Sequence, residues 1–356
     1  MKQRYRFAIM GLIAATILSL LAAGLLWKGP KLYTATVLPS LGGWHNRPHA
    51  INDLGQVVGE EHVGQDQRLF LWDRENGVRD LGSVTGDPLV INNAGQISGT
   101  MTDPNGNRQA FLWEPGCGRR MLGTLGGRTS IALAMNNHGQ IVGISYNAAN
   151  RIQFFLWDKA TGMRELPPPD SGPCWPVSIN DAGQVLMIAD PMGSSRWFLL
   201  DPNGPILLNE VPPRTSLRNV NRNLCIAGID ESNSSEPYLV FWDDKRIAKR
   251  LFPVSVHAQM TRLNDKNQVA CTSWRSRRWE RWRRRLFGPR MMTDESISYL
   301  WDPARGKISL DRYLPDAERF LVVDLNNNGC LIGSVYTKDR HWHAVLLEPI
   351  PKRWDR

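Results

Sequence analysis

The chain has 356 residues, of which 42% are hydrophobic and 22% charged, a composition that excludes a disordered, collagen-like or disulfide-stapled protein. This length allows two or three domains of about 100–200 residues, or one large closed fold. The net charge of +9 comes from two segments, because residues 1–31 carry +5, residues 272–290 carry +7, and the remaining chain sums to −3. The overall basicity therefore does not indicate a nucleic-acid-binding body.

The first predicted element is an apolar helix. After a basic segment at residues 1–6, Phe7–Trp27 forms an uncharged run of 21 residues that ends before Lys28. A helix of this length spans about 30 Å of hydrocarbon. Apolar residues continue past the small Ala22-Ala23-Gly24 segment, which disfavours a signal-peptide cleavage site.

We therefore expect a single-pass transmembrane signal-anchor helix at residues 7–27 and a linker at 28–32. Cleavage and secretion form the alternative. The excess of basic groups before the helix predicts that the body lies outside the cytoplasm.

Two phrases then recur through the rest of the chain. The first reads INDLGQVVG at Ile51–Gly59, and its copies begin with Asn52, Asn92, Asn136, Asn180, Asn221, Asn264 and Asn326. The second reads LFLWD at Leu69–Asp73, and its Trp recurs as Trp72, Trp113, Trp157, Trp242 and Trp301. A period of 40–44 residues, with one step of 62, indicates a repeat architecture.

Each repeat predicts four short strands, since Val, Ile, Phe and Trp favour strands and the Gly, Asn, Asp and Pro residues between them favour turns. The last repeat lacks a fourth strand, and LPSLGG at Leu38–Gly43 supplies the matching phrase before the first repeat. We predict an all-β fold, a seven-bladed β-propeller of four-stranded blades over residues 33–350, closed by the N-terminal strand and followed by a tail at 351–356.

These phrases resemble the HAF-repeat family of predicted extracellular bacterial repeat proteins. The match rests on A-x-IN-x-x-GQ-x-x-G, FLW-D/E and LGxLGG, and it covers about residues 33–350. The resemblance implies a secreted or surface-exposed propeller-like fold. The family has no established activity, so the resemblance implies no catalytic residues.

The recurring Asn and Trp residues have structural explanations. Each Asn/Asp hairpin offers two oxygens and no Glu, which favours a turn over a calcium loop. The five Trp residues share one fixed position of the repeat, which favours packing between blades over sugar-stacking platforms. Trp44, Trp175 and Trp342 lie outside that position and are candidates for an exposed rim.

A weak candidate binding site lies two residues before the repeat Asn, where later repeats carry Asn219, Arg262 and Asp324. If this position faces the central channel, the three form a polar sector on one wall; alternatively Arg262 and Asp324 form an ion pair. Two or more carboxylates in a deep pocket at the channel mouth would favour an enzyme acting on glycans, whereas a plugged channel with apolar walls would favour a scaffold.

No other constellation identifies a catalytic residue, a cofactor or a metal. His341 and His343 share one face of a predicted strand, but no third ligand can be named. The five cysteines are odd in number, and Cys225, Cys271 and Cys330 occupy repeat positions that predict burial.

The 62-residue step contains an insert at residues 272–290, expected in a loop of the sixth repeat. It combines basic and aromatic residues that suit an anionic lipid surface or envelope polymer, the contact set being Trp274, Arg275, Arg277, Arg278, Trp279, Arg281, Trp282, Arg283, Arg284 and Arg285. A solvated loop is the main alternative, and nucleic acid is a third.

We therefore expect a membrane-anchored, extracytoplasmic, non-enzymatic binding or scaffold module with an unknown protein or glycan ligand. A propeller hydrolase or lyase acting on glycans at the channel mouth is the alternative.

Overall fold

The computed structural model describes residues 31–351 apart from 84–88, 170–173, 190–195, 202, 209–210, 213, 234–236, 246, 256–257, 276–294 and 315–316. The expected transmembrane helix at residues 7–27 lies outside the described residues, as does the insert from 276 to 290. Within the described part of the chain, no helix is long and apolar enough to cross a membrane.

The described chain is almost entirely β-structure. Its one helical element is a single 3₁₀ turn, η1 (Asp311–Tyr313). In chain order the strands are β1 (Tyr33–Val37), β2 (His45–Ile51), β3 (Val57–Val63), β4 (Asp66–Asp73), β5 (Gly77–Ser83), β6 (Val90–Ile91), β7 (Ile97–Thr102), β8 (Arg108–Glu114), β9 (Gly118–Met121), β10 (Gly126–Met135), β11 (Ile141–Asn147), β12 (Ile152–Asp158), β13 (Gly162–Glu165), β14 (Cys174–Ile179), β15 (Val185–Ala189), β16 (Arg196–Asp201), β17 (Gly204–Leu207), β18 (Thr215–Val220), β19 (Ile226–Asp230), β20 (Tyr238–Trp242), β21 (Ala248–Pro253), β22 (Gln259–Leu263), β23 (Val269–Arg275), β24 (Glu295–Asp302), β25 (Gly306–Ser309), β26 (Arg319–Leu325), β27 (Leu331–Tyr336) and β28 (Trp342–Pro349).

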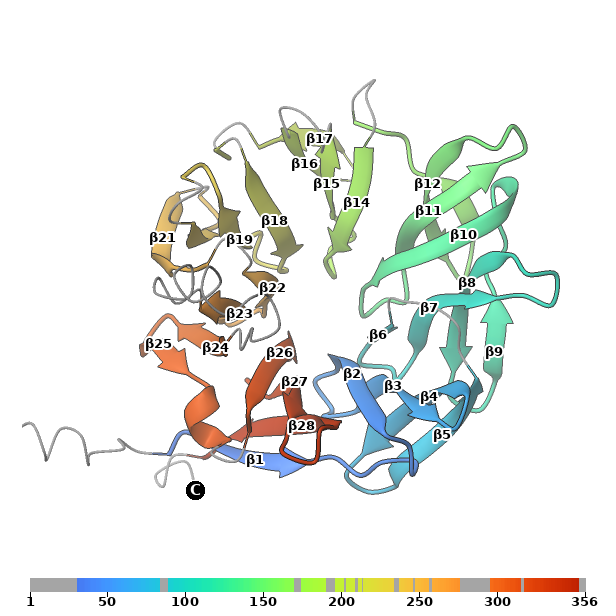
Figure 1. Cartoon of the computed structure of the whole chain (residues 1–356). Helices are drawn as coiled ribbons and strands as arrows, with labels where there is room; N and C mark the ends of the chain where they lie inside the picture. Colours follow the sequence, from blue (N-terminus) through green and yellow to red (C-terminus); the bar gives the residue numbers. More distant parts are fainter. Residues whose placement is uncertain are drawn as a thin grey trace, which may run out of the picture. The chain divides into compact units, whose positions relative to one another are not determined.

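These strands form sheets that follow one another around a central axis (Figure 1). Five sheets have four strands in chain order, namely β6–β9, β10–β13, β14–β17, β18–β21 and β22–β25. The sixth has eight strands and runs β26-β27-β28-β2-β3-β4-β5, with β1 also paired to β28. This is the architecture of a β-propeller.

The repeat phrases fall on the elements that they predict. In the first repeat, β2 ends at Ile51, the Asn52–Gln56 segment forms the hairpin, and the FLW phrase ends β4. The insert lies between β23 and β24, as expected, but its first residues differ from the prediction. Thr272–Arg275 belong to β23 and not to a loop, because Arg275 still pairs with Glu295 of β24.

The ends of the propeller meet in the eight-stranded sheet. β1 pairs with β28, and the Leu38 N–H donates to the Ala344 carbonyl at 2.8 Å. Leu122 makes the matching bond to Ala110 after β9, at 2.9 Å. The first strands of successive sheets also contact one another around the axis, including β26 with β2. The hydrogen bonds of Leu38 and Leu122 and the contact of β26 with β2 lie within the compact unit Ala35–Glu348. In a second unit, the Ile350 N–H donates to the Leu32 carbonyl at 2.9 Å.

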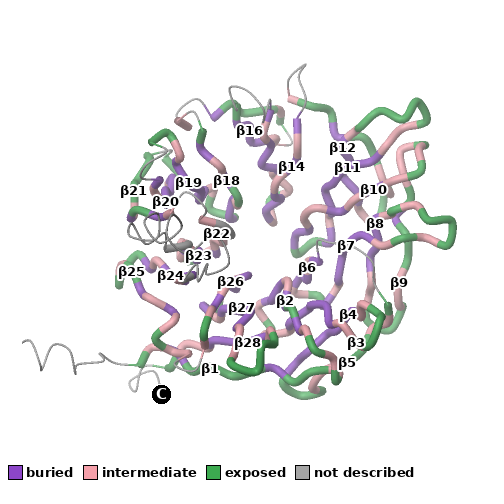
Figure 2. The backbone as a smooth tube through the Cα atoms, viewed as in Figure 1, coloured by how far each residue is buried: buried purple, intermediate pink, exposed green. Residues whose placement is uncertain are grey.

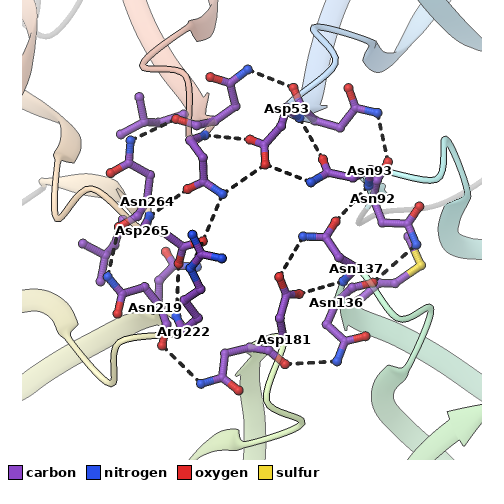
Figure 3. Close-up of a pocket in the computed structure, with 18 of the residues that line it drawn as sticks. Asp53, Asn92, Asn93, Asn136, Asn137, Asp181, Asn219, Arg222, Asn264 and Asp265 are labelled. Atoms are coloured by element: carbon purple, nitrogen blue, oxygen red, sulfur yellow. Dashed lines mark hydrogen bonds and ion pairs between the residues drawn. The ribbon is translucent and has the colours of Figure 1, made fainter. Parts of the chain in front are cut away.

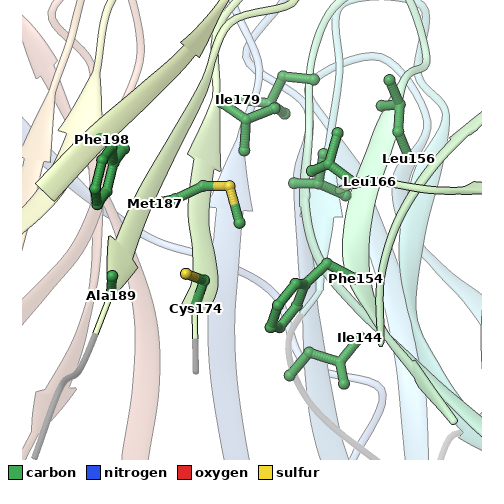
Figure 4. Close-up of a cluster of buried hydrophobic side chains, with 11 residues drawn as sticks. Ile144, Phe154, Leu156, Leu166, Cys174, Ile179, Met187, Ala189 and Phe198 are labelled. Carbon is green, nitrogen blue, oxygen red and sulfur yellow. The ribbon is translucent and has the colours of Figure 1, made fainter. Parts of the chain in front are cut away.

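The apolar core lies between neighbouring sheets, while connecting turns are exposed (Figure 2). Figure 4 shows the cluster between β10–β13 and β14–β17, to which Phe154 and Leu166 contribute from one sheet and Met187 from the next. The repeat Trp belongs to such clusters: Trp157 packs with Leu112 of the preceding sheet, and Trp242 with Leu199. The prediction that these Trp residues pack between blades is confirmed.

Candidate functional site: the axial Asn/Asp pocket

Seven hairpins converge on the axis, and each begins with the buried Asn of the first repeat phrase. Asn136 illustrates the local geometry, since its Oδ1 accepts from the N–H groups of His138 (3.1 Å) and Gln140 (3.0 Å). Its Nδ2 donates to Gln140 Oε1 at 2.7 Å. These bonds provide an acceptor for the backbone N–H groups of the turn. The interpretation of the Asn/Asp segments as structural turns therefore agrees with their geometry.

The same Asn side chains also join each hairpin to the next, a role that the sequence analysis missed. Each Nδ2 donates to the backbone carbonyl of the corresponding Asn in the following repeat, over 2.8–3.4 Å. The last of these bonds runs from Asn326 to Asn52 and closes the circle. All seven Asn residues are buried, and their amides therefore work both along and between the repeats.

A second circle is formed by the residue after each of these Asn residues. Its backbone N–H donates to the side-chain Oδ1 of the equivalent residue in the next repeat, over 2.7–3.1 Å at six of the steps around the axis. The remaining step runs from Asp181 to Arg222. It lacks this bond because a guanidinium has no acceptor. Arg222 turns instead to Asp265, with Nε 3.3 Å from Oδ2.

The two circles line a polar pocket of about 210 Å³ on the axis. Figure 3 shows Asp53, Asn93, Asn137, Asp181 and Asp265 around its mouth. Apolar residues such as Ile51 and Met135 lie beside them in the lining. The pocket is therefore built from the repeat itself, with Arg222 as its one basic member among the lining residues.

Three carboxylates meet in this pocket, and each accepts bonds from fixed donors. Asp53 Oδ2 accepts from Asn93 Nδ2 (2.8 Å) and from Asn327 Nδ2 (3.0 Å). Asp181 Oδ2 accepts from Asn137 Nδ2 at 2.9 Å. Asp265 Oδ2 accepts from Asn327 Nδ2 at 3.0 Å. The carboxylate oxygens are hydrogen-bond acceptors, so the pocket presents groups that can recognise a donor-rich or cationic ligand.

The predicted channel residues are only partly brought together. Arg262 and Asp324 form the ion pair considered as an alternative, with Nε 3.4 Å from Oδ1. Asp324 Oδ2 also accepts from the Ile51 N–H at 3.0 Å. Burial raises the pKa of Asp324 in spite of the neighbouring Arg262. Asn219 lines the axial pocket, and its buried Oδ1 has no hydrogen-bond partner among the described residues.

A second charged group lies near this sector. Arg218, next to Asn219 on β18, has its pKa lowered by desolvation and by the charge of Arg262. The sequence analysis did not single out Arg218, because this position carries no recurring residue type in the repeat. The assignment of Asn219, Arg262 and Asp324 as a ligand site stays a prediction.

The other sequence candidates have clear positions. His343 Nε2 lies 2.9 Å from Asp339 Oδ2, whereas His341 Nδ1 lies 4.0 Å from it. Within the described ranges, no group of three or more His, Cys, Asp or Glu is arranged to hold a metal. Trp44 is 51% exposed, and its ring stacks on His62 at 5.2 Å.

Of the residues in the predicted polyanion contact, only two lie in the described part. Trp274 and Arg275 end β23, where they pair with Ser296 and Glu295. The others lie outside the described residues, namely Arg277, Arg278, Trp279, Arg281, Trp282, Arg283, Arg284 and Arg285.

No family model matches the chain, and no curated protein matches it by sequence. Solved structures give the fold. The β-propeller domain of the Trilobed protease from Pyrococcus furiosus is similar at 11% identity and a TM-score of 0.56, over 92% of this chain and 100% of that one. Virginiamycin B lyase from Staphylococcus aureus is similar at 9% identity and a TM-score of 0.55, over 89% and 100%. A puromycin-hydrolyzing peptidase from Mycobacterium tuberculosis has 9% identity and a TM-score of 0.58, and this chain covers 57% of its length.

The chain is a β-propeller. At these identities the similarity extends to the fold alone, and it assigns neither a substrate nor a site.

Proposed function

We propose that this propeller is a membrane-anchored, extracytoplasmic, non-enzymatic binding or scaffold module of the HAF-repeat kind. In this proposal it has seven blades, since the eight-stranded sheet contains two four-strand runs, β26-β27-β28 with β1 and β2–β5, beside the five separate sheets. The observation that carries the scaffold role is the closed circle of amide bonds, which ends with Asn326 bonded to Asn52. Side chains committed to such a network hold the ring rigid and present its surface loops.

The membrane part of the proposal rests on sequence. The uncharged Phe7–Trp27 run has the length of a spanning helix, and the Arg/Trp insert adds a second basic and aromatic segment. We place the insert against an anionic lipid surface or envelope polymer. Arg275 and Glu295 pair directly, so a short turn can replace residues 276–294 without disturbing β23 or β24.

Sedimentation with vesicles tests this contact. Residues 29–356 are compared with the same chain in which a Gly-Asn turn replaces 276–294, on anionic and neutral vesicles at low and high salt. We expect the first protein to bind anionic vesicles in a salt-dependent manner and the second to lose this binding. Equal binding by both proteins would show that the insert is not the contact, and preferential binding to nucleic acid would replace the membrane with a different partner.

A hydrolase or lyase acting on glycans remains the second candidate, supported by the three carboxylates in the axial pocket. If Asp53 or Asp181 carries chemistry, D53N or D181N should abolish turnover of a glycan while the folded state persists. Absence of turnover by the wild-type chain on a panel of envelope glycans would oppose this candidate.

A further inference from the structure

One position of the repeat fills the space between neighbouring sheets. In the β10–β13 sheet, Trp157 lies opposite Ile141 at the end of the third strand. In the β14–β17 sheet, Leu200 holds the same position, opposite Val185. Leu200 therefore stands where five of the other described third strands, β12 among them, place an indole.

A basic side chain from the preceding sheet covers the indole at two of these positions. Arg120 lies 4.7 Å from the ring centroid of Trp157, and Lys249 lies 5.6 Å from that of Trp301. Arg164 of β13 occupies the same register position as Arg120. The next sheet offers it Leu200 in place of a ring. Arg164 makes no hydrogen bond or ring contact among the described residues, and its charge interacts with that of Asp158.

Leu200 and Arg164 both line a groove of about 880 Å³ between the two sheets. Apolar side chains form much of its lining, including Leu156, Leu166, Val185 and Leu200. Figure 4 shows Leu156 and Leu166 near each other in the apolar cluster between the two sheets. Both residues also line the groove. Small-molecule sites have volumes of about 300–1,000 Å³ and mostly apolar walls with a few polar groups.

Loss of the Trp does not by itself explain why Arg164 has no ring to cover. Leu347 of β28 also replaces a Trp, but there the preceding sheet carries Ile308 at the position of the basic residue. Leu347 is fully buried and Ile308 is 7% exposed, so two aliphatic residues are accommodated in the core. The β13–β16 boundary instead keeps the cation and lacks the ring.

We propose that this groove binds a small, flat aromatic molecule of about the size of indole, with its ring beneath Arg164 in the place of the missing Trp. The guanidinium is attracted to the ring face, and the aliphatic floor supplies the apolar contact. Of the two basic side chains in the lining, Lys159 is already bonded to Glu114 at 3.2 Å, which leaves Arg164 for the ligand. The groove shares Asp181 with the axial pocket, whereas Arg164 and Leu200 line the groove and not the axial pocket. The proposal uses no residue of the insert, so it does not depend on the membrane proposal.

Fluorine NMR of 5-fluoroindole with the full chain in detergent tests this site, with a protein-free detergent sample as the reference. The wild-type chain should broaden the resonance in a saturable manner. L200W fills the groove with the residue of the other repeats, and we expect at least a tenfold loss of affinity. R164A should weaken binding about threefold, as expected for a partly exposed cation–ring contact.

L207W is the matched control, because Leu207 is 42% exposed on β17 and does not line the groove. It adds an indole to the same sheet and should bind 5-fluoroindole as the wild type does. L200F provides a smaller ring if L200W does not fold. No saturable broadening by the wild-type chain, or equal binding by the wild type and the folded Leu200 variants, would overturn the proposal.

Discussion

The axial circle makes a quantitative prediction about Asn136. Asn136→Ala removes four hydrogen bonds at a site that is 4% exposed: two accepted by Oδ1 within the hairpin, and two donated by Nδ2 to Gln140 and to the Asn180 carbonyl. At about 1 kcal/mol per bond, the expected loss in the free energy of unfolding is about 4 kcal/mol.

Asn147 provides the control in the same sheet. Its Oδ1 accepts from the N–H groups of Ala149 and Arg151, both at 3.0 Å, in a hairpin at the outer end of β11. Its Nδ2 makes no hydrogen bond among the described residues. N147A therefore loses only the two hairpin bonds, which in a more exposed position should cost about 1 kcal/mol.

Urea unfolding followed by circular dichroism measures both variants. The two losses in the free energy of unfolding should differ by about 3 kcal/mol. This difference measures the bonds made by the buried Asn136 Nδ2 together with the greater burial of that site. If N136A and N147A lose the same stability, the bond to the next repeat contributes nothing and the circle is not what holds the ring. Equal slopes of free energy against urea are needed for the comparison.

Three further outcomes follow from individual residues. Burial raises the pKa of Asp311 to about 6 from the reference value of 3.8, so its ionisation destabilises the native state. Wild-type stability should therefore fall by about 2.4 kcal/mol relative to D311N as the pH rises from 4 to 7.5, measured by urea unfolding at both values; parallel curves would contradict this. Cys271 is fully buried with its pKa raised to about 12, whereas Cys117 is exposed. Ellman's reagent at pH 8 should therefore modify Cys117 of the native protein and leave Cys271 unmodified, as mapped by mass spectrometry of single-cysteine variants. R222N and R222A both lose the contact with Asp265, but R222N also offers an acceptor to the Asp181 N–H in the second circle. R222N should therefore be about 1 kcal/mol more stable than R222A. Equal stability of the two variants would argue against that circle.

The strand pattern could be predicted from sequence because the repeat phrases report directly on local structure. A Gly or Asn in the hairpin and an alternation of Val and Ile on either side specify a strand–turn–strand unit without reference to distant residues. The two repeats that replace the hairpin Gly keep the same turn, with Leu224 and Asn267 at φ of 61° and 60°. The hairpin could therefore be recognised from the sequence even in the two repeats that lack this Gly.

The site could not be predicted in the same way, because its bonds join residues one repeat apart. The Asn52 amide satisfies its own hairpin, which is sufficient reason for an Asn, and its bond to the Asn92 carbonyl leaves no further signature in the sequence. The acceptor role of the following residue did leave one, since six of the seven repeats carry Asn or Asp there and Arg222 is the exception. The interpretation of these residues as turn residues did not use that restriction, which is the one trace of the shared contact in the sequence.

Departures from a repeat are informative only when the partner position is considered with them. At Arg222 the acceptor is lost, and the guanidinium contacts Asp265 instead. The backbone N–H of Asp181 therefore lacks the bond that the equivalent residues make to the next repeat. At Leu347 the ring is lost together with the basic residue, and burial of Ile308 and Leu347 compensates. At Leu200 the ring alone is lost, and Arg164 lines a groove without a ring to cover. A repeat that diverges without constraint would fill the space beside Leu200 or lose the charge of Arg164. Because neither has happened, a ligand at this position can supply the contact that the missing ring would make.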